Sequence, residues 1–274
     1  MSRLDVQKTY KLYIGGAFPR TESGRYFKLE HEGQLVANLC QGSRKDFRNA
    51  VVAARKAQDS WAARTGYNRG QILYRVAEML EGRAAQFIAE LAAVGVSETD
   101  AREEVMAAID AWVYYAGWCD KYQQLASSVN PVASPHFNFT VPEPTGVVAA
   151  LAPSTGGLLG LCRTLAAIMA SGNTAIVLAA ENYGHVAISL AEVIHSSDVP
   201  GGVVNLLTGH AAELLPHMSS HMDVNALALE NPGEEERTAA AENVKRVVAL
   251  RADDGLENIT DFVEYKTTWH PIGA

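Results

Sequence analysis

The segment Pro142-Glu-Pro-Thr-Gly146-Val-Val-Ala-Ala-Leu-Ala152-Pro-Ser-Thr-Gly-Gly157 opens the stretch that decides the fold. A long apolar segment, Leu158–Ala170, follows and is succeeded by a second apolar run, Ala175-Ile-Val-Leu-Ala179. Continuous apolar runs are typical of strands buried on both faces, as in a parallel sheet. Leu158–Ala170 is long enough for a helix and ends at Ser171-Gly172, where glycine suits a helix C-terminus. We therefore predict a strand–turn–helix–strand unit that opens a doubly wound, Rossmann-like α/β domain.

Composition sets the class of protein. The 274 residues are 48% hydrophobic and 20% charged, which suffices for a sizeable core. A formal net charge of −8 argues against a nucleic-acid partner, which needs a basic surface. No apolar run is long enough to span a bilayer, and the first residues lack the apolar centre of a signal peptide. Three scattered cysteines do not make a disulfide framework, so we expect a cytoplasmic protein with no membrane partner.

The remaining periodicities divide the chain into five segments. We expect a hairpin and helical layer over 1–131, an arm strand in 132–145, a Rossmann-like core over 146–250, a polar connector over 251–261, and a second arm strand in 262–274. An aromatic stripe in the third helix is at helical spacing and is more typical of core than of a ligand pocket. The expected helices are Ser43–Ala63 with Ser43 as N-cap, Asn68–Ala93, Thr99–Trp118, Gly184–Ser196, Ala211–Ser219 and Glu234–Asn243; the other expected strands are Tyr10–Phe18 pairing back with Tyr26–Leu29, Val203–Thr208, Val224–Leu229 and Lys245–Leu250.

Two alternating segments predict the arm. Val132–Val141 places Phe137, Phe139 and Val141 on one face of a strand. Phe262–Trp269 places Val263, Tyr265 and Trp269 on one face of another. A bare strand pair with these side chains would be adhesive, so we predict that they form an interface.

Several phrases resemble the aldehyde dehydrogenase superfamily. They are Ile14-Gly-Gly-Ala-Phe18, Pro200-Gly-Gly-Val-Val-Asn-Leu-Leu-Thr-Gly209, Ala239-Ala-Ala-Glu-Asn-Val-Lys-Arg-Val247 and Phe262-Val-Glu-Tyr-Lys-Thr-Thr-Trp269. The last resembles the family's terminal strand, which completes its oligomerisation arm. The resemblance implies that the family's catalytic domain should lie where 251–261 stands, so the chain looks like a truncated member. It is similar to the shortened second half of tandem two-domain aldehyde dehydrogenases.

The chemistry that the resemblance implies is missing. The family needs a thiolate nucleophile and a carboxylate base. Cys40, Cys119 and Cys162 lie outside any catalytic domain, and we interpret them as structural. The family's base would fall in Val248–Arg251, which holds no acid, and we interpret Asp253 and Asp254 beyond it as solvated. We therefore predict no catalytic residue.

Cofactor contacts are predicted to be vestigial. Gly156-Gly157-Leu-Leu-Gly160 is half of a dinucleotide fingerprint, with Thr155 in place of the first glycine. These glycines either hold an anion or serve close helix–strand packing, which we favour. In the family a Trp-Asn pair supplies the oxyanion donor, where Ser154-Thr155 stands here. The remaining candidate contacts with NAD are Thr155, Gly156, Glu181, which could accept from ribose hydroxyls, and Gly209.

Two further departures from the family predict that NAD binds weakly or not at all. By resemblance, a lysine at the end of the second core strand grips the adenosine ribose, and Ala179-Ala180 stands there. A Thr-Gly-Ser turn under the pyrophosphate is replaced by Glu230-Asn231-Pro232-Gly233, whose carboxylate repels phosphate and whose proline removes a donor. These acids, with those that follow, equally suit a helix N-terminus.

One spacing resembles a metal site. His217 and His221 are four residues apart, with His210 and Glu213 before them. Pro216 interrupts the predicted helix between them, and we predict no metal.

The sequence supports two main hypotheses of function. The first is a non-catalytic subunit that binds and stabilises or positions a full-length aldehyde dehydrogenase in a hetero-oligomer. The alternative is an NAD(P)-binding component of an aldehyde dehydrogenase, and a third reading is a free-standing nucleotide sensor. Saturable NAD binding is required by the last two and not by the first.

Overall fold

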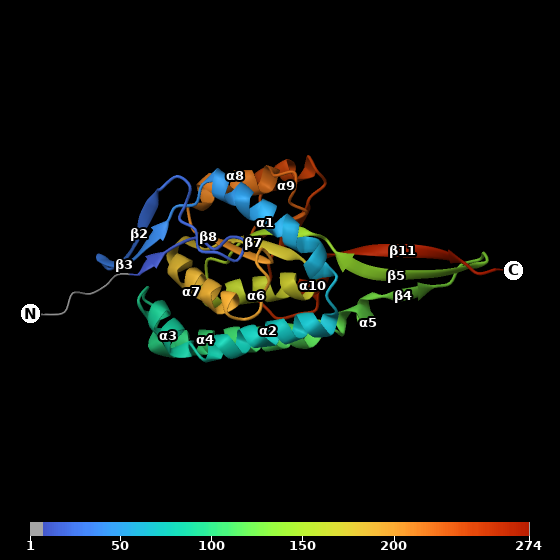
Figure 1. Cartoon of the computed structure of the whole chain (residues 1–274), viewed down its shortest axis with the longest axis horizontal. Coiled ribbons are helices and arrows are strands. Elements are labelled where there is room, and N and C mark those ends of the chain that lie inside the picture. The colour runs from blue at the N-terminus through green and yellow to red at the C-terminus, as the bar shows by residue number, and fades with distance from the viewer. Residues whose placement is uncertain (1–7, 274) are drawn as a thin grey trace, which may run out of the picture.

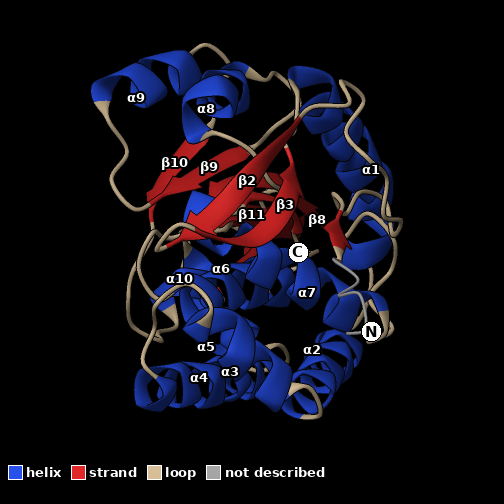
Figure 2. Ribbon diagram, turned by 90° about the vertical axis from the view of Figure 1, so that its left-hand side faces the viewer, coloured by secondary structure: helices blue, strands red, loops and turns tan. Residues whose placement is uncertain are grey.

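The computed structural model describes residues 8–273. These residues form a layered α/β body and a β-sheet arm that projects from one end of it (Figure 1). The body holds a parallel sheet between helical layers, and a further layer of helices lies outside one of them (Figures 1 and 2). This is the α/β class that the apolar runs predict.

The central sheet is doubly wound, as predicted. It consists of β6 (Val147–Leu151), β7 (Thr174–Leu178), β8 (Val204–Leu207), β9 (Ala226–Leu229) and β10 (Arg246–Ala249). The strand order is β10-β9-β6-β7-β8, and every neighbouring pair is parallel. The chain runs outward through β7 and β8 and then returns to the other side of β6. The topological switch point, where such sheets bind ligands, therefore lies between β6 and β9.

Helices cover both faces of the sheet because its strands are apolar on both faces. One face is covered by α6 (Gly157–Ala170) and α7 (Gly184–His195), with a 3₁₀ turn over Glu181–Tyr183 between β7 and α7; the other is covered by α1 (Arg44–Ala62), α8 (Ala211–Ser220) and α9 (Glu234–Ala241) (Figure 2). Ser43 caps α1 as predicted, in a reciprocal capping box with Asp46.

The outer helical layer corrects two predictions. It comprises α2 (Gly66–Glu81), α3 (Ala84–Ala92), α4 (Glu98–Trp118) and the short α5 (Tyr122–Ala126). The single helix predicted over Asn68–Ala93 is two helices, because the chain turns at Gly82-Arg83. The cap of α4 is Ser97 and not Thr99, since Ser97 Oγ accepts from Asp100 N at 3.1 Å. The aromatic stripe of α4 is core, with Trp112 and Tyr115 buried as predicted.

The N-terminal hairpin differs from the predicted one. Its strands are β1 (Thr9–Tyr10), β2 (Tyr26–His31) and β3 (Gln34–Cys40). β2 pairs antiparallel with β3, and β1 pairs parallel with β3. The strand β3 was not predicted from the sequence. The two-residue turn Glu32-Gly33 has positive φ at both positions (48° and 76°), which suits a tight hairpin. This close turn favours β3 over the more distant Tyr10–Phe18 as the partner of β2.

The arm is a three-stranded antiparallel sheet of β4 (Ser128–Asn130), β5 (His136–Pro144) and β11 (Val263–Pro271), in the order β11-β5-β4. β5 begins at His136, later than the predicted Val132, and continues to Pro144. In the β5–β11 register Tyr265 lies opposite Pro142 and Trp269 opposite Asn138. Directly opposed residues share a face. Tyr265 and Trp269 therefore lie on the other face of the arm from Phe137 and Phe139.

A buried polar corner joins the arm to the body. Asn173, fully buried before β7, accepts from Gly146 N at 2.6 Å and donates to Phe262 O at 2.7 Å. Gln58 of α1 donates to Gly172 O at 3.0 Å and accepts from Thr174 N at 2.9 Å. Buried amides with all these partners hold the starts of β6, β7 and β11 in one arrangement.

The connector at 251–261 is folded and not simply a polar link. It contains α10 (Glu257–Thr260), and Ile259 is fully buried in the core. Asp254, predicted to be solvated, instead accepts two hydrogen bonds from Arg163, each 2.9 Å long. The partner of Asp254 is the guanidinium of Arg163 on α6, which is distant in sequence and could not be predicted from the residues around Asp254.

Candidate functional site

Hydrogen bonds link the two loops that border the crevice at the carboxyl ends of β6 and β9. Ser154, after β6, donates from its backbone N and from its Oγ to Glu230 Oε2, after β9, at 3.0 Å each. A cavity of about 290 Å³ lies beside this link. It is lined by Pro153, Thr155, Gly156, Leu159, Gly160, Arg163, Glu230, Asn231, Leu250, Arg251 and Ala252. The crevice of the doubly wound sheet is therefore a small cavity bordered by a carboxylate.

Glycine is favoured at three positions at the start of α6, for different structural reasons. Gly156 has φ +62°, and a Cβ added there would meet no atom within 4 Å, so its left-handed backbone alone favours glycine. A Cβ on Gly157 would overlap the ring of Tyr183. A Cβ on Gly160 would lie 2.9 Å from Cβ of Pro153. Gly157 and Gly160 thus serve close packing, the interpretation that the sequence favours.

The N-terminus of α6 holds a carboxylate from within the chain. Glu104, on α4, accepts from Leu158 N at 2.7 Å and from Leu159 N at 3.2 Å. Free N–H groups at a helix N-terminus, with the helix dipole, form the anion site that dinucleotide phosphates use. A phosphate at this site would have to displace Glu104. Nothing in the sequence around Glu104 signals its contact with α6, which lies 54 residues later in the chain.

Glu181 and Gly209, two candidate cofactor contacts, lie near the next helix terminus. Glu181 accepts from Ala211 N at 3.2 Å and lies 3.0 Å from Nδ1 of His210. Gly209 is buried, and a Cβ there would lie 3.2 Å from Gly42 N. Glu181 therefore caps α8, and a ribose hydroxyl would compete with that contact.

Two acidic side chains in and after the turn that follows β9 have hydrogen-bond partners within the chain. Glu236 accepts from Gly233 N at 2.9 Å, which caps α9. Pro232 has no N–H to donate. Among the carboxylates of this turn and the start of α9, Glu230 lines the cavity. Of the candidate cofactor contacts, Thr155 and Gly156 line the cavity, whereas Glu181 and Gly209 do not.

The thiols lack the properties of a nucleophile. Cys162 is fully buried in α6, and burial raises its pKa to about 12. Burial likewise raises the pKa of Cys119 to about 12. Both thiols are therefore protonated near neutral pH, which supports a structural role.

The cavity's cationic side chains already have partners. Arg163 binds Asp254, and Arg251 forms an ion pair with Asp261. Leu250 and Arg251 belong to the stretch Val248–Arg251, where the resemblance places a catalytic base, and that stretch holds no carboxylate. The cavity therefore offers neither a free carboxylate base at this position nor an unpaired guanidinium for a phosphate among the described residues.

The histidines that suggested a metal site have separate partners. His210 contacts Glu181, and Glu213 accepts from Arg25 at 2.9 Å and from Gln41 at 2.7 Å. His221 accepts from Asp223 N at 3.2 Å. Within residues 8–273, no group of three or more His, Cys, Asp or Glu side chains is placed to hold a metal ion.

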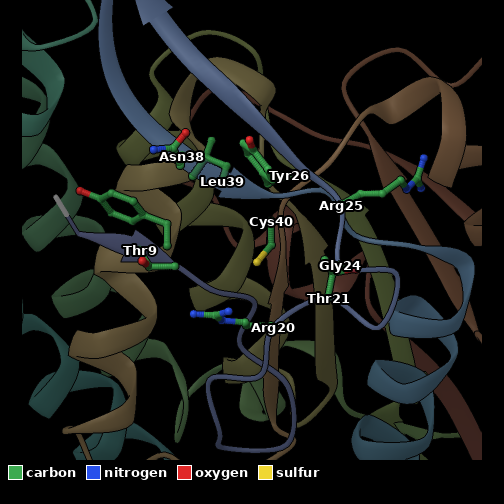
Figure 3. A pocket seen from close by; sticks show the side chains of 10 residues that line it. Thr9, Arg20, Thr21, Gly24, Arg25, Tyr26, Asn38, Leu39 and Cys40 are labelled. Carbon is green, nitrogen blue, oxygen red and sulfur yellow. The ribbon is translucent and has the colours of Figure 1, made fainter.

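A second cavity, of about 390 Å³, lies at the N-terminal hairpin (Figure 3). It is lined by Thr9, Tyr10, Arg20, Thr21, Gly24, Arg25, Tyr26, Asn38, Leu39 and Cys40. Arg25 is paired with Glu213, and Thr21 Oγ1 donates to Asp46 at 2.7 Å. These ten described residues include no carboxylate or imidazole that could activate Cys40, so the cavity does not form a nucleophilic site.

The arm exposes apolar side chains at positions that the sequence singled out. Phe137 and Phe139 lie with ring centroids 5.5 Å apart over a hollow of about 360 Å³, which Val129 and Val141 also line. On the other face, Tyr265 and Trp269 are 54% and 56% exposed.

Val263 is the exception among the six predicted interface residues. It is fully buried in the body's core, at the base of β11, and is not available to a partner. The alternation of residues predicted on which face of the strand Val263 lies, but it could not predict that the helical body covers that position.

Comparisons with known proteins agree with this architecture. Residues 26–250 match the aldehyde dehydrogenase family. The putative aldehyde dehydrogenase DhaS of Bacillus subtilis is 31% identical over 253 residues, which are 88% of this chain and 50% of that protein. Cytosolic 10-formyltetrahydrofolate dehydrogenase of Mus musculus is 30% identical over 259 residues, 90% of this chain and 29% of that protein.

The solved structures show the same fold. The NAD⁺ complex of the aldehyde dehydrogenase from Bacillus cereus superimposes with a TM-score of 0.82 at 27% identity, covering 88% of this chain and 50% of that chain. The chain spans about half the length, or less, of the curated relatives described above. None of the helices described for it has the length and apolar character needed to cross a bilayer. Since the family match covers most of its residues, the chain belongs to the aldehyde dehydrogenase family.

Proposed function

We propose that this chain is a non-catalytic subunit that binds a full-length aldehyde dehydrogenase and stabilises or positions it. The observation that carries the proposal is a contrast within the molecule. At the crevice, the chain's own carboxylates occupy the anion sites, with Glu104 at the start of α6 and Glu230 across the switch point. On the arm, apolar side chains such as Phe137 remain exposed without a partner in the described residues.

The described residues lack the reactive groups that aldehyde oxidation needs, which supports a non-catalytic role. By the family resemblance, aldehyde oxidation needs a thiolate nucleophile, and the thiols of Cys119 and Cys162 are buried with raised pKa values. The described residues between β10 and β11 form a short folded connector and no second domain. Chemistry therefore has to come from another subunit. We place this work in the cytoplasm, a location that remains a prediction from composition.

The arm supports the role through what it exposes. By the family resemblance, such an arm packs on the catalytic domain of a neighbouring subunit. The described residues carry an arm but no such domain, so two copies cannot exchange one for the other. A full-length aldehyde dehydrogenase has the missing surface. The hollow beneath Phe137 and Phe139 is lined almost entirely by apolar atoms, which suits burial against a partner.

The alternative function, an NAD(P)-binding component of an aldehyde dehydrogenase, has observations in its favour too. The sheet is fully parallel, and Gly156 keeps the left-handed turn before α6. A relative with the same fold was solved as an NAD⁺ complex. Calorimetric titration with NAD⁺ and NADP⁺ separates the two functions, because the alternative requires saturable binding and the subunit role does not.

The subunit role is tested by mixing the purified chain with a full-length aldehyde dehydrogenase from the same genome. Size-exclusion chromatography with light scattering should show a complex of defined stoichiometry. Phe137→Asp and Tyr265→Asp, one on each face of the arm, should weaken it. Val52→Asp, at an apolar position on α1 that is at least as exposed as these two, serves as the matched control and should not weaken the complex. A panel of full-length relatives that all elute separately from the wild-type chain would contradict the proposal.

A further inference from the structure

β11 presents an unpaired backbone edge. It lies at the end of the sheet order β11-β5-β4, and no other described segment pairs with its outer side. At its two ends, Phe262 O accepts from Thr145 N, and Ile272 N donates to Pro135 O. Even-numbered residues of this stretch thus point their N–H and C=O groups toward β5, and odd-numbered residues point theirs outward. The free edge therefore carries the backbone groups of Tyr265, Thr267 and Trp269.

This edge is bounded at both ends. Arg246 Nη1 donates to Val263 O at 2.6 Å, so the outward carbonyl at the base of β11 already has a partner. Pro271, at the other end, has no N–H to donate outward. A strand added to this edge can form a full ladder only with the three residues between these limits.

We propose that a second copy of this chain pairs with this edge, with β11 antiparallel to its counterpart about a two-fold axis at Thr267. In that register Thr267 faces itself and Tyr265 faces Trp269 of the other copy. Each N–H and C=O of the three outward residues then meets its complement, because all three occupy hydrogen-bonded positions. The two arms join into one continuous sheet, in which each arm supplies the strand that the other lacks.

The side chains favour this register over its neighbours. Tyr265 and Trp269, each more than half exposed, stand directly opposite each other as an aromatic pair at both ends. Glu264 lies opposite His270, which avoids a like-charge contact. A shift of the axis to residue 266 would place Lys266 against its own copy, which is destabilising. Shifts in the other direction would bring Pro271 into the ladder.

The shape of the molecule permits the pairing. The arm projects clear of the helical layers, with β11 along one side of it (Figure 1). Antiparallel pairing directs the two arms past each other, so the two bodies lie at opposite ends of the shared sheet. The apolar hollow at Phe137 and Phe139 stays on one face of that sheet, away from the paired edges.

This inference does not rest on the proposed function. It concerns the chain in isolation, whereas the proposed function concerns a full-length relative. The two are separated by the protein used in each experiment, since loss of self-association leaves binding to a relative to be measured independently.

The test measures the mass of the purified chain and two variants by sedimentation equilibrium. The monomer has a mass of 29.5 kDa, and we expect about twice that mass for the wild type. Thr267→Pro removes the N–H at the two-fold axis and should halve the mass. Thr267→Val is the matched control, because it also loses the 2.9 Å contact with Thr140 Oγ1 but keeps the N–H, and it should remain dimeric. Near-ultraviolet circular dichroism checks that both variants are folded.

A cross-linking experiment tests the register without proline. Residues 266 and 268 of opposite copies form non-hydrogen-bonded pairs, with Cα atoms about 4.5 Å apart, which a disulfide can span. The double variant Lys266→Cys/Thr268→Cys should oxidise to a covalent dimer, and Lys266→Cys alone should cross-link at least tenfold more slowly. A wild-type monomer at all concentrations, a dimeric Thr267→Pro variant, or equal cross-linking of the single and double variants would each overturn the proposal.

Discussion

Removal of one internal carboxylate should make the crevice more receptive to NAD⁺. Glu104 and Glu230 place negative charge at the start of α6 and across the switch point. The substitutions Glu104→Gln and Glu230→Gln keep an acceptor oxygen for the same N–H groups while they remove the charge. Any change in NAD⁺ affinity in these variants therefore reports the repulsion between the carboxylate and the phosphates, and not a change in the shape of the site.

The magnitude follows from distance and environment. A phosphate that approached the α6 terminus would come within about 5 Å of either carboxylate, where two unit charges repel by about 3 kcal/mol at an effective dielectric constant of 20. Both side chains are partly exposed, so screening reduces this figure. We expect each variant to bind NAD⁺ roughly 10- to 100-fold more tightly than the wild type. We expect the wild type itself to bind NAD⁺ weakly, because the loss of two charge-assisted contacts at roughly 1.5–3 kcal/mol each would reduce affinity by about two to four orders of magnitude.

Isothermal titration calorimetry with NAD⁺ provides the measurement. Glu143→Gln on the arm is the matched control, since it changes net charge equally at a distance from the crevice and should leave affinity unchanged. A wild-type dissociation constant in the low micromolar range would show that the crevice is not excluded at all. Variants that bind no better than the wild type would refute the view that these two carboxylates are what keeps phosphate out.

The isolated chain should oxidise no aldehyde with NAD⁺ or NADP⁺; turnover that Cys162→Ala or Cys119→Ala abolishes would contradict this. Asn173→Ala should lower the free energy of unfolding, measured by urea titration, by about 2–4 kcal/mol. The reason is that the backbone groups of Gly146 and Phe262 would stay buried without a hydrogen-bond partner, at about 1–3 kcal/mol each. A loss below about 1 kcal/mol would show that the surrounding structure rearranges to satisfy these groups. Burial lowers the pKa of His185, so the unfolded chain binds a proton more readily and stability should fall as pH drops below about 6.5. His185→Gln should flatten the dependence of melting temperature on pH between 7.5 and 5.5, with His221, whose pKa burial also lowers, accounting for what remains.

The parallel sheet could be predicted from sequence because burial on both faces leaves a local record. A strand covered on both sides is apolar at most of its positions, and it can be recognised without knowledge of its partners. The second core strand, predicted at Ala175–Ala179, is observed at Thr174–Leu178, one residue earlier. The cap of α1 at Ser43 was equally local, since its partner Asp46 lies three residues away.

The details that decide function are contacts between distant segments. Glu104 reaches backbone groups 54 residues later in the chain, and its immediate neighbours do not reveal this. The arm shows the same limit, because alternation assigns faces within each strand but only register relates the faces of two strands. That register places Tyr265 opposite Pro142, and Val263 opposite Pro144. Both prolines therefore occupy non-hydrogen-bonded positions, where a missing N–H costs no ladder bond.

The body and the arm differ in how completely the chain satisfies its own groups. In the body, Glu104, Glu181 and Glu236 accept hydrogen bonds from backbone N–H groups at the starts of α6, α8 and α9, so an external phosphate would compete with them there. Along β11, the outward backbone groups have no partner among the described residues, and Phe137 across the sheet remains exposed. Asn173 holds these two regions in one fixed arrangement, because it bonds both Gly146 and Phe262. Unsatisfied groups on a rigid support are the ones that gain free energy from association, so the activity of this chain should be sought in what binds its arm.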